Sequence, residues 1–238
     1  MDAPSTTPSS ARPRPGSRRS RIALTVLTVL CVLTALFAVS AYVGLDPGDS
    51  QVGLREGVAL HYPLLIVHIV TSTTALLALP LQFRPALRRS GAHRVIGRVG
   101  LFAGVLPGAV SGLGVAVLST SGLVAQAGFA LLSVLWFAFA VAGYRAVRQG
   151  RHAEHREWMV RVFALTLAGV TLRVLIPLLT LLLLPLLEPV YGGDEELYFL
   201  EIYQAITWLC WVPNLIAAEW FLGRYRTTRS SRWTSSRS

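Results

Sequence analysis

Residues 84–118 of the chain read RPALRRSGAHRVIGRVGLFAGVLPGAVSGLGVAVL. Five arginines lie in the first fifteen positions, and the twenty residues that follow, 99–118, carry no charge. An uncharged apolar run of about 20 residues is long enough for an α-helix to cross the hydrocarbon core of a bilayer. Arginine and lysine accumulate on the cytoplasmic side of such helices. The stretch therefore predicts a transmembrane helix that starts at the cytoplasmic face.

The same alternation of arginine and apolar sequence extends over the whole chain. All 22 basic residues are arginines, and 20 of them fall in four clusters, at 12–21, 84–98, 145–161 and 224–237. Between consecutive clusters lie two apolar stretches, separated by a loop almost free of arginine. This pattern predicts six membrane spans, near 22–43, 61–83, 95–118, 123–143, 158–185 and 198–222.

The charges of the loops predict the orientation. Both ends of the chain and the loops near 84–94 and 144–157 are rich in arginine, whereas acidic residues are found in the opposite loops near 46–56 and 188–196. An excess of arginine marks cytoplasmic loops. Helices are expected because lipid cannot satisfy free backbone polar groups. We therefore predict an all-α integral membrane helical bundle with six transmembrane helices and both termini cytoplasmic.

Composition supports a location in the cell membrane as a multi-pass protein. Only 14% of the residues are charged and 53% are hydrophobic, whereas a soluble domain averages about 25% charged residues. The net charge of +10 would suggest nucleic acid as the partner of a soluble protein. Here the charge is divided among segments that flank apolar runs, so the expected partner is the lipid bilayer and no nucleic acid is expected.

The chain divides into four segments. Residues 1–20 and 223–238 are expected to be disordered basic cytoplasmic tails. Residues 21–44 are expected to form the first transmembrane helix, and residues 60–222 a five-helix membrane domain. The first apolar run could instead be a signal peptide cleaved before Ala41, but its core is longer than the usual 7–15 residues. The fifth span is over-long, and Pro177 and Pro185 suggest a kink or tilt.

Glycines on the third span indicate close approach of another group. Gly100, Gly104, Gly108 and Gly112 recur every four residues and share one helix face. Such a face allows a neighbouring helix to pack very closely. Alternatively, it could accommodate a flat ring such as a porphyrin or a quinone. The spacing does not distinguish the two readings.

Two histidines lie at matching depth on different spans. His93 opens the third span and His155 precedes the fifth, and both spans start at the predicted cytoplasmic face. Two imidazoles so placed could be the axial ligands of one b-type haem. They could equally be interfacial residues that contact lipid phosphates or acidic partners.

Arg173 is the arginine that topology does not explain. It lies about 15 residues into the fifth span, where a charge is costly and usually faces the bundle interior. The nearest candidate partners are Glu201 and Gln204 on the sixth span. Arg173 could form a structural clasp with them. It could also bind an anionic or carbonyl-bearing ligand, or take part in proton movement with His68.

A set of motifs between residues 60 and 222 is characteristic of one family. The motifs are His68 with Ala75-Leu76 and Gln82-Phe83, His93-Arg94-Val95-Ile96-Gly97-Arg98, His155-Arg156-Glu157-Trp158-Met159-Val160-Arg161, Ala164-Leu165-Thr166 with Thr171-Leu172-Arg173, and Trp211-Val212-Pro213-Asn214-Leu215 with Glu219. With these motifs the chain resembles the bacterial predicted membrane proteins of the domain-of-unknown-function 2306 family. The resemblance implies a helical membrane fold and no established activity. The layout is also loosely similar to that of two-haem transmembrane b-type cytochromes, but the fourth span has no histidine.

Three hypotheses about function follow. The first is a cytochrome-like membrane redox protein with one haem b near the cytoplasmic face, held by His93 and His155 against Gly100, Gly104 and Gly108, with a quinone or another membrane redox partner. The second is a transporter or small-ligand-binding protein centred on His68 and Arg173 with Glu201 and Gln204. The third is a structural or accessory membrane protein without a ligand. Sequence leaves open whether the protein is an enzyme.

Overall fold

The computed structural model describes residues 18–84, 87 and 90–234, and from residue 225 onward the backbone alone. Of these residues, 84% are helical and none is in a strand. The described part of the chain contains six helices that are long and apolar enough to cross a membrane. The predicted all-α membrane bundle with six spans is thereby confirmed. The basic tail before residue 18 lies outside the described residues.

Three of the six spans are single uninterrupted helices. They are α1 (Arg18–Ser40), α2 (His61–Gln82) and α6 (Gly122–Arg148). Between α1 and α2 the chain forms a loop with one short turn of 3-10 helix, η1 (Pro47–Asp49). Pro80 lies near the end of α2, which stops two residues later.

The third span contains a widened turn that the sequence analysis did not predict. It consists of α4 (Gly91–Arg98), the π-helical segment η2 (Val99–Val105) and α5 (Leu106–Leu118). At its end the amide of Leu106 bonds to the carbonyl of Leu101, five residues back. Pro107 follows directly and has no N–H to offer the preceding turn. The π-helix therefore lies where a proline disturbs the regular hydrogen-bond ladder.

The fifth span is interrupted twice, and the second interruption coincides with Pro185. It consists of α7 (His152–Thr166), α8 (Ala168–Leu183), the 3-10 turn η3 (Leu184–Leu186) and α9 (Leu187–Tyr191). The break falls at Leu167 in the middle of the span, and Pro177 lies inside α8 without ending it. Pro185 lies in η3, where the helix does change its winding.

The sixth span is also broken, and one side chain joins its break to the fifth span. Cys210 and Trp211 separate α10 (Glu195–Leu209) from α11 (Val212–Thr234). The side-chain nitrogen of Asn214 donates to the carbonyl of Cys210 at 2.9 Å and to the hydroxyl of Thr171, on α8, at 3.0 Å. One residue thus satisfies a freed carbonyl and links two spans near their breaks.

The tail predicted to be disordered from residue 223 onward is helical instead. α11 continues as far as Thr234, and residues 235–238 lie outside the described part. The helix therefore extends about a dozen residues past the apolar part of the span. Composition alone did not show that the helix of the last span would continue into the basic segment.

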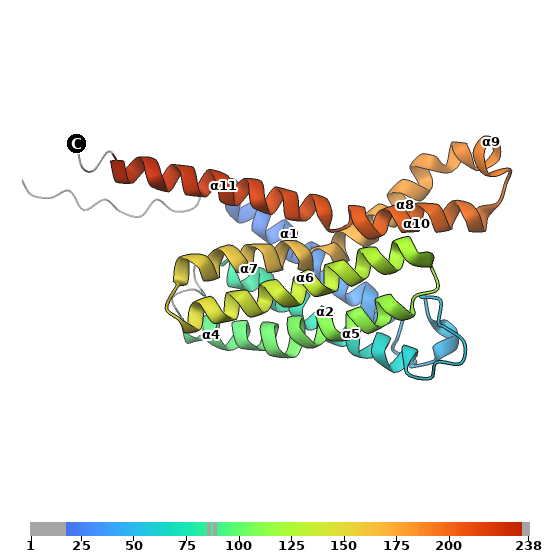
Figure 1. Cartoon of the computed structure of the whole chain (residues 1–238), viewed down its shortest axis with the longest axis horizontal. Coiled ribbons are helices and arrows are strands. Elements are labelled where there is room, and N and C mark those ends of the chain that lie inside the picture. Colours follow the sequence, from blue (N-terminus) through green and yellow to red (C-terminus); the bar gives the residue numbers. More distant parts are fainter. Residues whose placement is uncertain (1–17, 85–86, 88–89, 235–238) are drawn as a thin grey trace, which may run out of the picture.

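Figure 1 shows the consequence of the two breaks. The helices α2, α5, α6 and α7 form a compact layer, whereas α8 and α9 rise away from it at one end. Helix α1 lies against α2 and, to a smaller extent, against α8. The main core lies between α2, the third span, α6, α7 and α10, and it includes Leu79, Val105, Trp136, Leu165 and Ile206.

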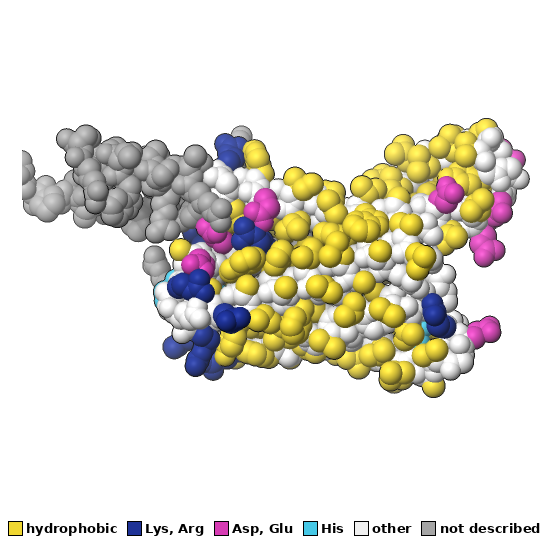
Figure 2. All heavy atoms as spheres, in the orientation of Figure 1, with side chains coloured by type: hydrophobic (Ala, Val, Ile, Leu, Met, Phe, Trp, Pro, Cys, Tyr) yellow, Lys and Arg dark blue, Asp and Glu magenta, His cyan; other side chains and the backbone are white. Residues whose placement is uncertain are grey.

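The charged side chains divide the bundle into two ends and an apolar belt. Figure 2 shows arginines gathered mainly at one end of the visible face, with apolar side chains between the ends. We call this end the arginine-rich end, and the opposite one, with the 41–60 loop and α9, the acidic end. Which of the two faces the cytoplasm stays a prediction from the arginine distribution.

Candidate functional site: a cavity inside the membrane span

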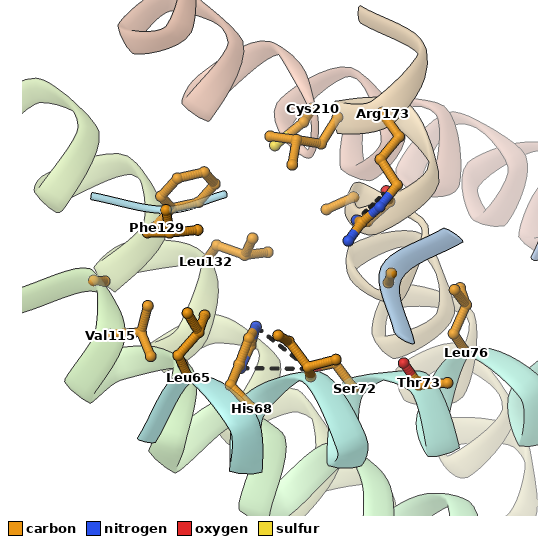
Figure 3. A pocket seen from close by; sticks show the side chains of 18 of the residues that line it. Leu65, His68, Ser72, Thr73, Leu76, Val115, Phe129, Leu132, Arg173 and Cys210 are labelled. Atoms are coloured by element: carbon orange, nitrogen blue, oxygen red, sulfur yellow. Dashed lines mark hydrogen bonds between the residues drawn. The ribbon is translucent and has the colours of Figure 1, made fainter. Parts of the chain in front are cut away.

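A cavity of about 320 Å³ lies between α1, α2, α5, α6, α8 and α10. Most of its lining is apolar, with Leu65, Leu76, Phe129 and Leu132 among the walls seen in Figure 3. Its lining residues include no aspartate or glutamate, and Arg173 is the lining residue that carries a formal charge. Ligand pockets in proteins are commonly about 300–1,000 Å³, mostly apolar and equipped with a few convergent polar groups. The cavity has these properties.

His68 enters the cavity from α2, and its neighbours determine which ring nitrogen carries the proton. The Nδ1 atom lies 2.9 Å from the carbonyl oxygen of Gly108, and a carbonyl can only accept. Nδ1 therefore carries the hydrogen, and in the neutral ring Nε2 is left as an acceptor. The hydroxyl of Ser72 lies 3.4 Å from Nε2. Nε2 of His68 is thus a hydrogen-bond acceptor in the cavity, and its contact with Ser72 is long and weak.

Gly112 makes the room that this ring occupies. A Cβ atom at position 112 would lie 2.7 Å from Cε1 and 2.8 Å from Nδ1 of His68. Neither distance is compatible with an undisturbed imidazole. The fourth glycine of the sequence repeat therefore has a specific use, which is to admit His68 between α2 and α5.

Arg173 enters the same cavity from α8, and Figure 3 shows the guanidinium and the His68 ring both pointing into it. Its Nη1 atom donates to the carbonyl of Gly169, one turn back on the same helix, at 3.0 Å. Its Nε atom is buried without a partner. Within the described part of the chain, Arg173 forms no ion pair with a carboxylate, unlike Arg151, which pairs with Glu154, and Arg161, which pairs with Glu219.

The structure does not bring Arg173 together with its predicted partners, Glu201 and Gln204. The Glu201 carboxylate accepts from the Tyr191 hydroxyl at 2.9 Å, outside the cavity. The Gln204 amide donates to the carbonyl of Ser121 at 2.9 Å, in the turn before α6. Both side chains are engaged with groups other than Arg173. The residue of α10 that lines the cavity in their place is Tyr203.

Several cavity residues were missed by the sequence analysis. They are polar or aromatic residues that no motif had singled out, namely Tyr42, Ser72, Phe129, Ser133 and Trp136. The indole nitrogen of Trp136 donates to the hydroxyl of Thr166 at 3.0 Å, which holds the ring in the cavity wall. Hydroxyl and aromatic residues are common in apolar helices, so only packing could identify these five.

The geometry at His93 does not fit an axial haem ligand. The amide of Gln82, oriented to satisfy its neighbours, donates to the carbonyl of His93 at 3.1 Å and to its Nδ1 at 2.7 Å, and accepts from the amide of Gly97 at 3.2 Å. A Nδ1 that accepts leaves the proton of the neutral ring on Nε2. An iron ligand needs that nitrogen unprotonated. His93 instead joins the start of α4 to the end of α2.

His155 and the glycine face are likewise engaged in packing. Nδ1 of His155 donates to the carbonyl of Gly143 at 2.8 Å and so ties α7 to α6. A Cβ at position 100 would lie 2.9 Å from Cβ of Ala78, and one at position 104 would lie 2.8 Å from the backbone nitrogen of Ala75. Position 108 faces Trp136, Ser72 and Thr71 in the same way. Helix α2 occupies the face that a porphyrin would need, so the glycines, like His93, do not fit the haem hypothesis.

Metal ligands of other kinds are also not assembled. Among the described residues no three histidine, cysteine or acidic side chains come together as a metal-binding group. The two cysteines, Cys31 and Cys210, are both buried and unpaired. The polar groups that could contact a ligand in the cavity are therefore a guanidinium, an imidazole and hydroxyl groups, and they lie among apolar side chains.

Comparison with known proteins places the chain in a family without providing a function. The family model described as "Predicted membrane protein (DUF2306)" matches residues 65–222. The match covers α2 to the first part of α11 and leaves α1 outside. No curated protein and no solved structure matches the chain.

Proposed function

Since this chain belongs to the DUF2306 family of predicted membrane proteins, whose name states no activity, we propose a function from the cavity: it binds a small lipophilic molecule that carries an acidic or carbonyl head group. The proposal is a form of the second sequence hypothesis, with Glu201 and Gln204 removed from the site. Arg173 would bind the head group, and His68 would orient it.

The observation that carries the proposal is a guanidinium inside the membrane span that the described residues leave without an acidic partner. Placing an arginine at the centre of a membrane helix costs about 2.5–3.5 kcal/mol on insertion scales. Burial of a charge is normally compensated by an opposite charge or by strong hydrogen bonds. One backbone carbonyl is a modest compensation, so the remaining donors favour a ligand with acceptor oxygens.

The chemistry of the other walls narrows the ligand further. Arg173 offers donors, whereas neutral His68 offers Nε2 as an acceptor, so a head group with both an acceptor oxygen and a hydroxyl satisfies both. The apolar walls suit a hydrocarbon or an aromatic body. A carboxylic acid and a hydroxylated or reduced quinone meet this description.

The proposal is tested by ligand-dependent stability in detergent micelles. Thermal unfolding of the full chain is followed with decanoate, with a decyl-chain benzoquinone and with decanol, which has neither an acidic nor a carbonyl group. Decanoate or the quinone is expected to raise the unfolding temperature, and decanol to have no comparable effect. Arg173→Gln is expected to weaken binding about tenfold or more, because a hydrogen bond to a charged group is lost.

Arg145→Gln is the matched control, because Arg145 is exposed in the last turn of α6, away from the cavity. That variant should bind both probes as the unaltered protein does. Equal stabilisation by all three probes, or equal binding by the Arg173→Gln variant, would contradict the proposal. The choice between decanoate and the quinone reports which head group the site prefers.

A further inference from the structure

We infer that the ligand of this cavity is an amphiphile that enters sideways from the bilayer, between α1 and α8, and keeps its chain in that opening. The inference rests on the proposed function and adds the route and the shape of the ligand. Its support comes from three features: the wall and rim that α1 makes, the partial cover of the cavity at the acidic end by the 50–55 segment, and the divergence of α8 from the bundle.

Helix α1 forms a wall of the cavity and at the same time its rim. Thr34, Phe37 and Ala38 line the cavity, together with Tyr42 just after the helix. Phe37 lines it although 56% of this residue is exposed. A side chain that borders a cavity and also lies on the outer surface marks a place where the two meet. Since the outer surface of α1 faces lipid, the cavity opens there to the hydrocarbon.

Helices α1 and α8 pack together near the middle of α1, where Cys31 and Ala35 form a buried cluster with Leu76 and Val170. Toward the acidic end, Leu172 and Ile176 of α8 line the cavity and pack on the main core. Figure 1 shows α8 rising away from the bundle in this direction. Together with Phe37 at the rim on α1, these features place the lateral opening in the half of the membrane next to the acidic end.

The acidic end of the cavity is partly covered by the 50–55 segment. Arg55 donates from Nε to the carbonyl of Leu118 at 3.2 Å and from Nη2 to the carbonyl of Ser119 at 3.3 Å. The hydroxyl of Thr120 donates to the carbonyl of Gly53 at 3.3 Å. These three bonds fasten the segment over the turn between α5 and α6. Its residues Gln51 and Val52 line the cavity, and Gln51 is also exposed at the surface.

The position of the opening determines the shape of the ligand. With its head group on Arg173, a molecule that fills the cavity can continue past Ile176 and Phe37 into the hydrocarbon. A chain longer than the cavity is then no obstacle, because the excess remains in lipid. The family core, residues 65–222, supplies the head-group site. Helix α1, which lies outside that match, supplies the wall against which the chain packs.

The route is tested with a photoactivatable stearate that carries a diazirine at the middle of its chain. The full chain in detergent micelles is irradiated with this probe, with and without excess decanoate, and the modified residues are located by mass spectrometry. Modification at 34–38 or at 172–176 is expected, and it should disappear with decanoate and in Arg173→Gln. Decanoate competes only if the labelled chain belongs to a molecule whose head group occupies the site.

A pair of α1 variants gives an independent measurement. Phe37→Ala is expected to weaken stearate binding about threefold to tenfold, because contacts with the chain are lost, and to weaken decanoate binding less, because the shorter chain makes fewer contacts at the rim. Leu33→Ala is the matched control, because Leu33 is 57% exposed on the same helix but does not line the cavity. Neither side chain is buried, so neither variant should impair folding.

The outcomes separate this inference from the proposed function. If neither decanoate nor stearate binds, the proposed function itself is wrong. If decanoate binds through Arg173 but the competed modification falls only on 51–52, the ligand enters from the water side and the lateral route is wrong. The lateral route is also wrong if Phe37→Ala and Leu33→Ala bind stearate equally well.

Discussion

At the scale of single residues, the cavity depends on how two basic side chains are held. Arg173 is turned back along its own helix to Gly169, and His68 is fixed by the carbonyl of Gly108. Both side chains therefore bond to backbone and leave their remaining polar atoms for the cavity. This arrangement keeps the site open, whereas an Arg173–Glu201 pair would have filled it with a salt bridge.

Gly112→Ala is expected to disturb the site while preserving the fold. The added Cβ would lie 2.7 Å from Cε1 of His68, so the ring must move and its bond to Gly108 must lengthen or break. A hydrogen bond of this kind contributes about 0.5–1.5 kcal/mol, which predicts a loss of decanoate affinity of roughly threefold to tenfold. Calorimetric titration of the purified variant with decanoate measures the change.

Gly114→Ala, two residues along α5, is the control for this substitution. Its Cβ would meet Cδ1 of Leu64 at 3.1 Å, the far end of a flexible side chain. Its affinity for decanoate should stay close to that of the unaltered protein. Unchanged binding by Gly112→Ala would show that the position of His68 is not important for the ligand.

At the scale of elements, α2 is the helix against which the third span is packed. The glycine repeat brings the two backbones together, and Pro107 coincides with the π-helical turn that precedes α5. Spans five and six are each broken near mid-membrane, and Asn214 links α8 to α11 through Thr171. The breaks let α8 diverge, and this divergence opens the cavity.

Gly104→Ala is expected to destabilise the contact between η2 and α2. The new Cβ would lie 2.8 Å from the nitrogen and 2.9 Å from Cα of Ala75, and a helix backbone cannot turn aside as a side chain does. Overpacking of this kind costs about 1–3 kcal/mol. The expected result is a lower unfolding temperature in detergent, followed by circular dichroism.

Gly91→Ala provides the comparison, because no atom would lie within 4 Å of its Cβ at the start of α4. Alanine is a better helix former than glycine by roughly 1 kcal/mol, so this variant should be equally or more stable. If Gly104→Ala unfolded at the same temperature as Gly91→Ala, close packing would not be the role of the repeat.

At the scale of the whole molecule, the separation of charge between the two ends predicts the orientation in the membrane. Glu195 and Arg148 are both exposed, at the acidic and the arginine-rich end respectively. In intact cells, a membrane-impermeant maleimide is expected to label Glu195→Cys and to label Arg148→Cys only after permeabilisation. Cys31 and Cys210 are buried and should contribute little background. Labelling in the reverse order would place the termini outside.

The outcome for the candidate site shows where inference from sequence ends. Depth in the membrane can be predicted by counting residues along a helix, and this reasoning proposed Glu201 and Gln204 as partners of Arg173. The direction in which a side chain points depends on the rotation of its helix, and this rotation is set by packing. The same reasoning applies to His93 and His155, whose matching depth suggested a shared ligand although each is bonded to a neighbouring helix.

The arginine clusters and the apolar runs are sufficient by themselves to predict an all-helical membrane protein with six spans. These properties depend on hydrophobicity and charge, which act locally along the chain and can be counted. The cavity exists only in the tertiary structure, because it forms where α8 diverges from the bundle at Leu167. Arg173 illustrates the difference. The sequence alone shows that a charge lies within a membrane span and is costly there. Only the packing of the helices around Arg173 determines which groups its side chain faces.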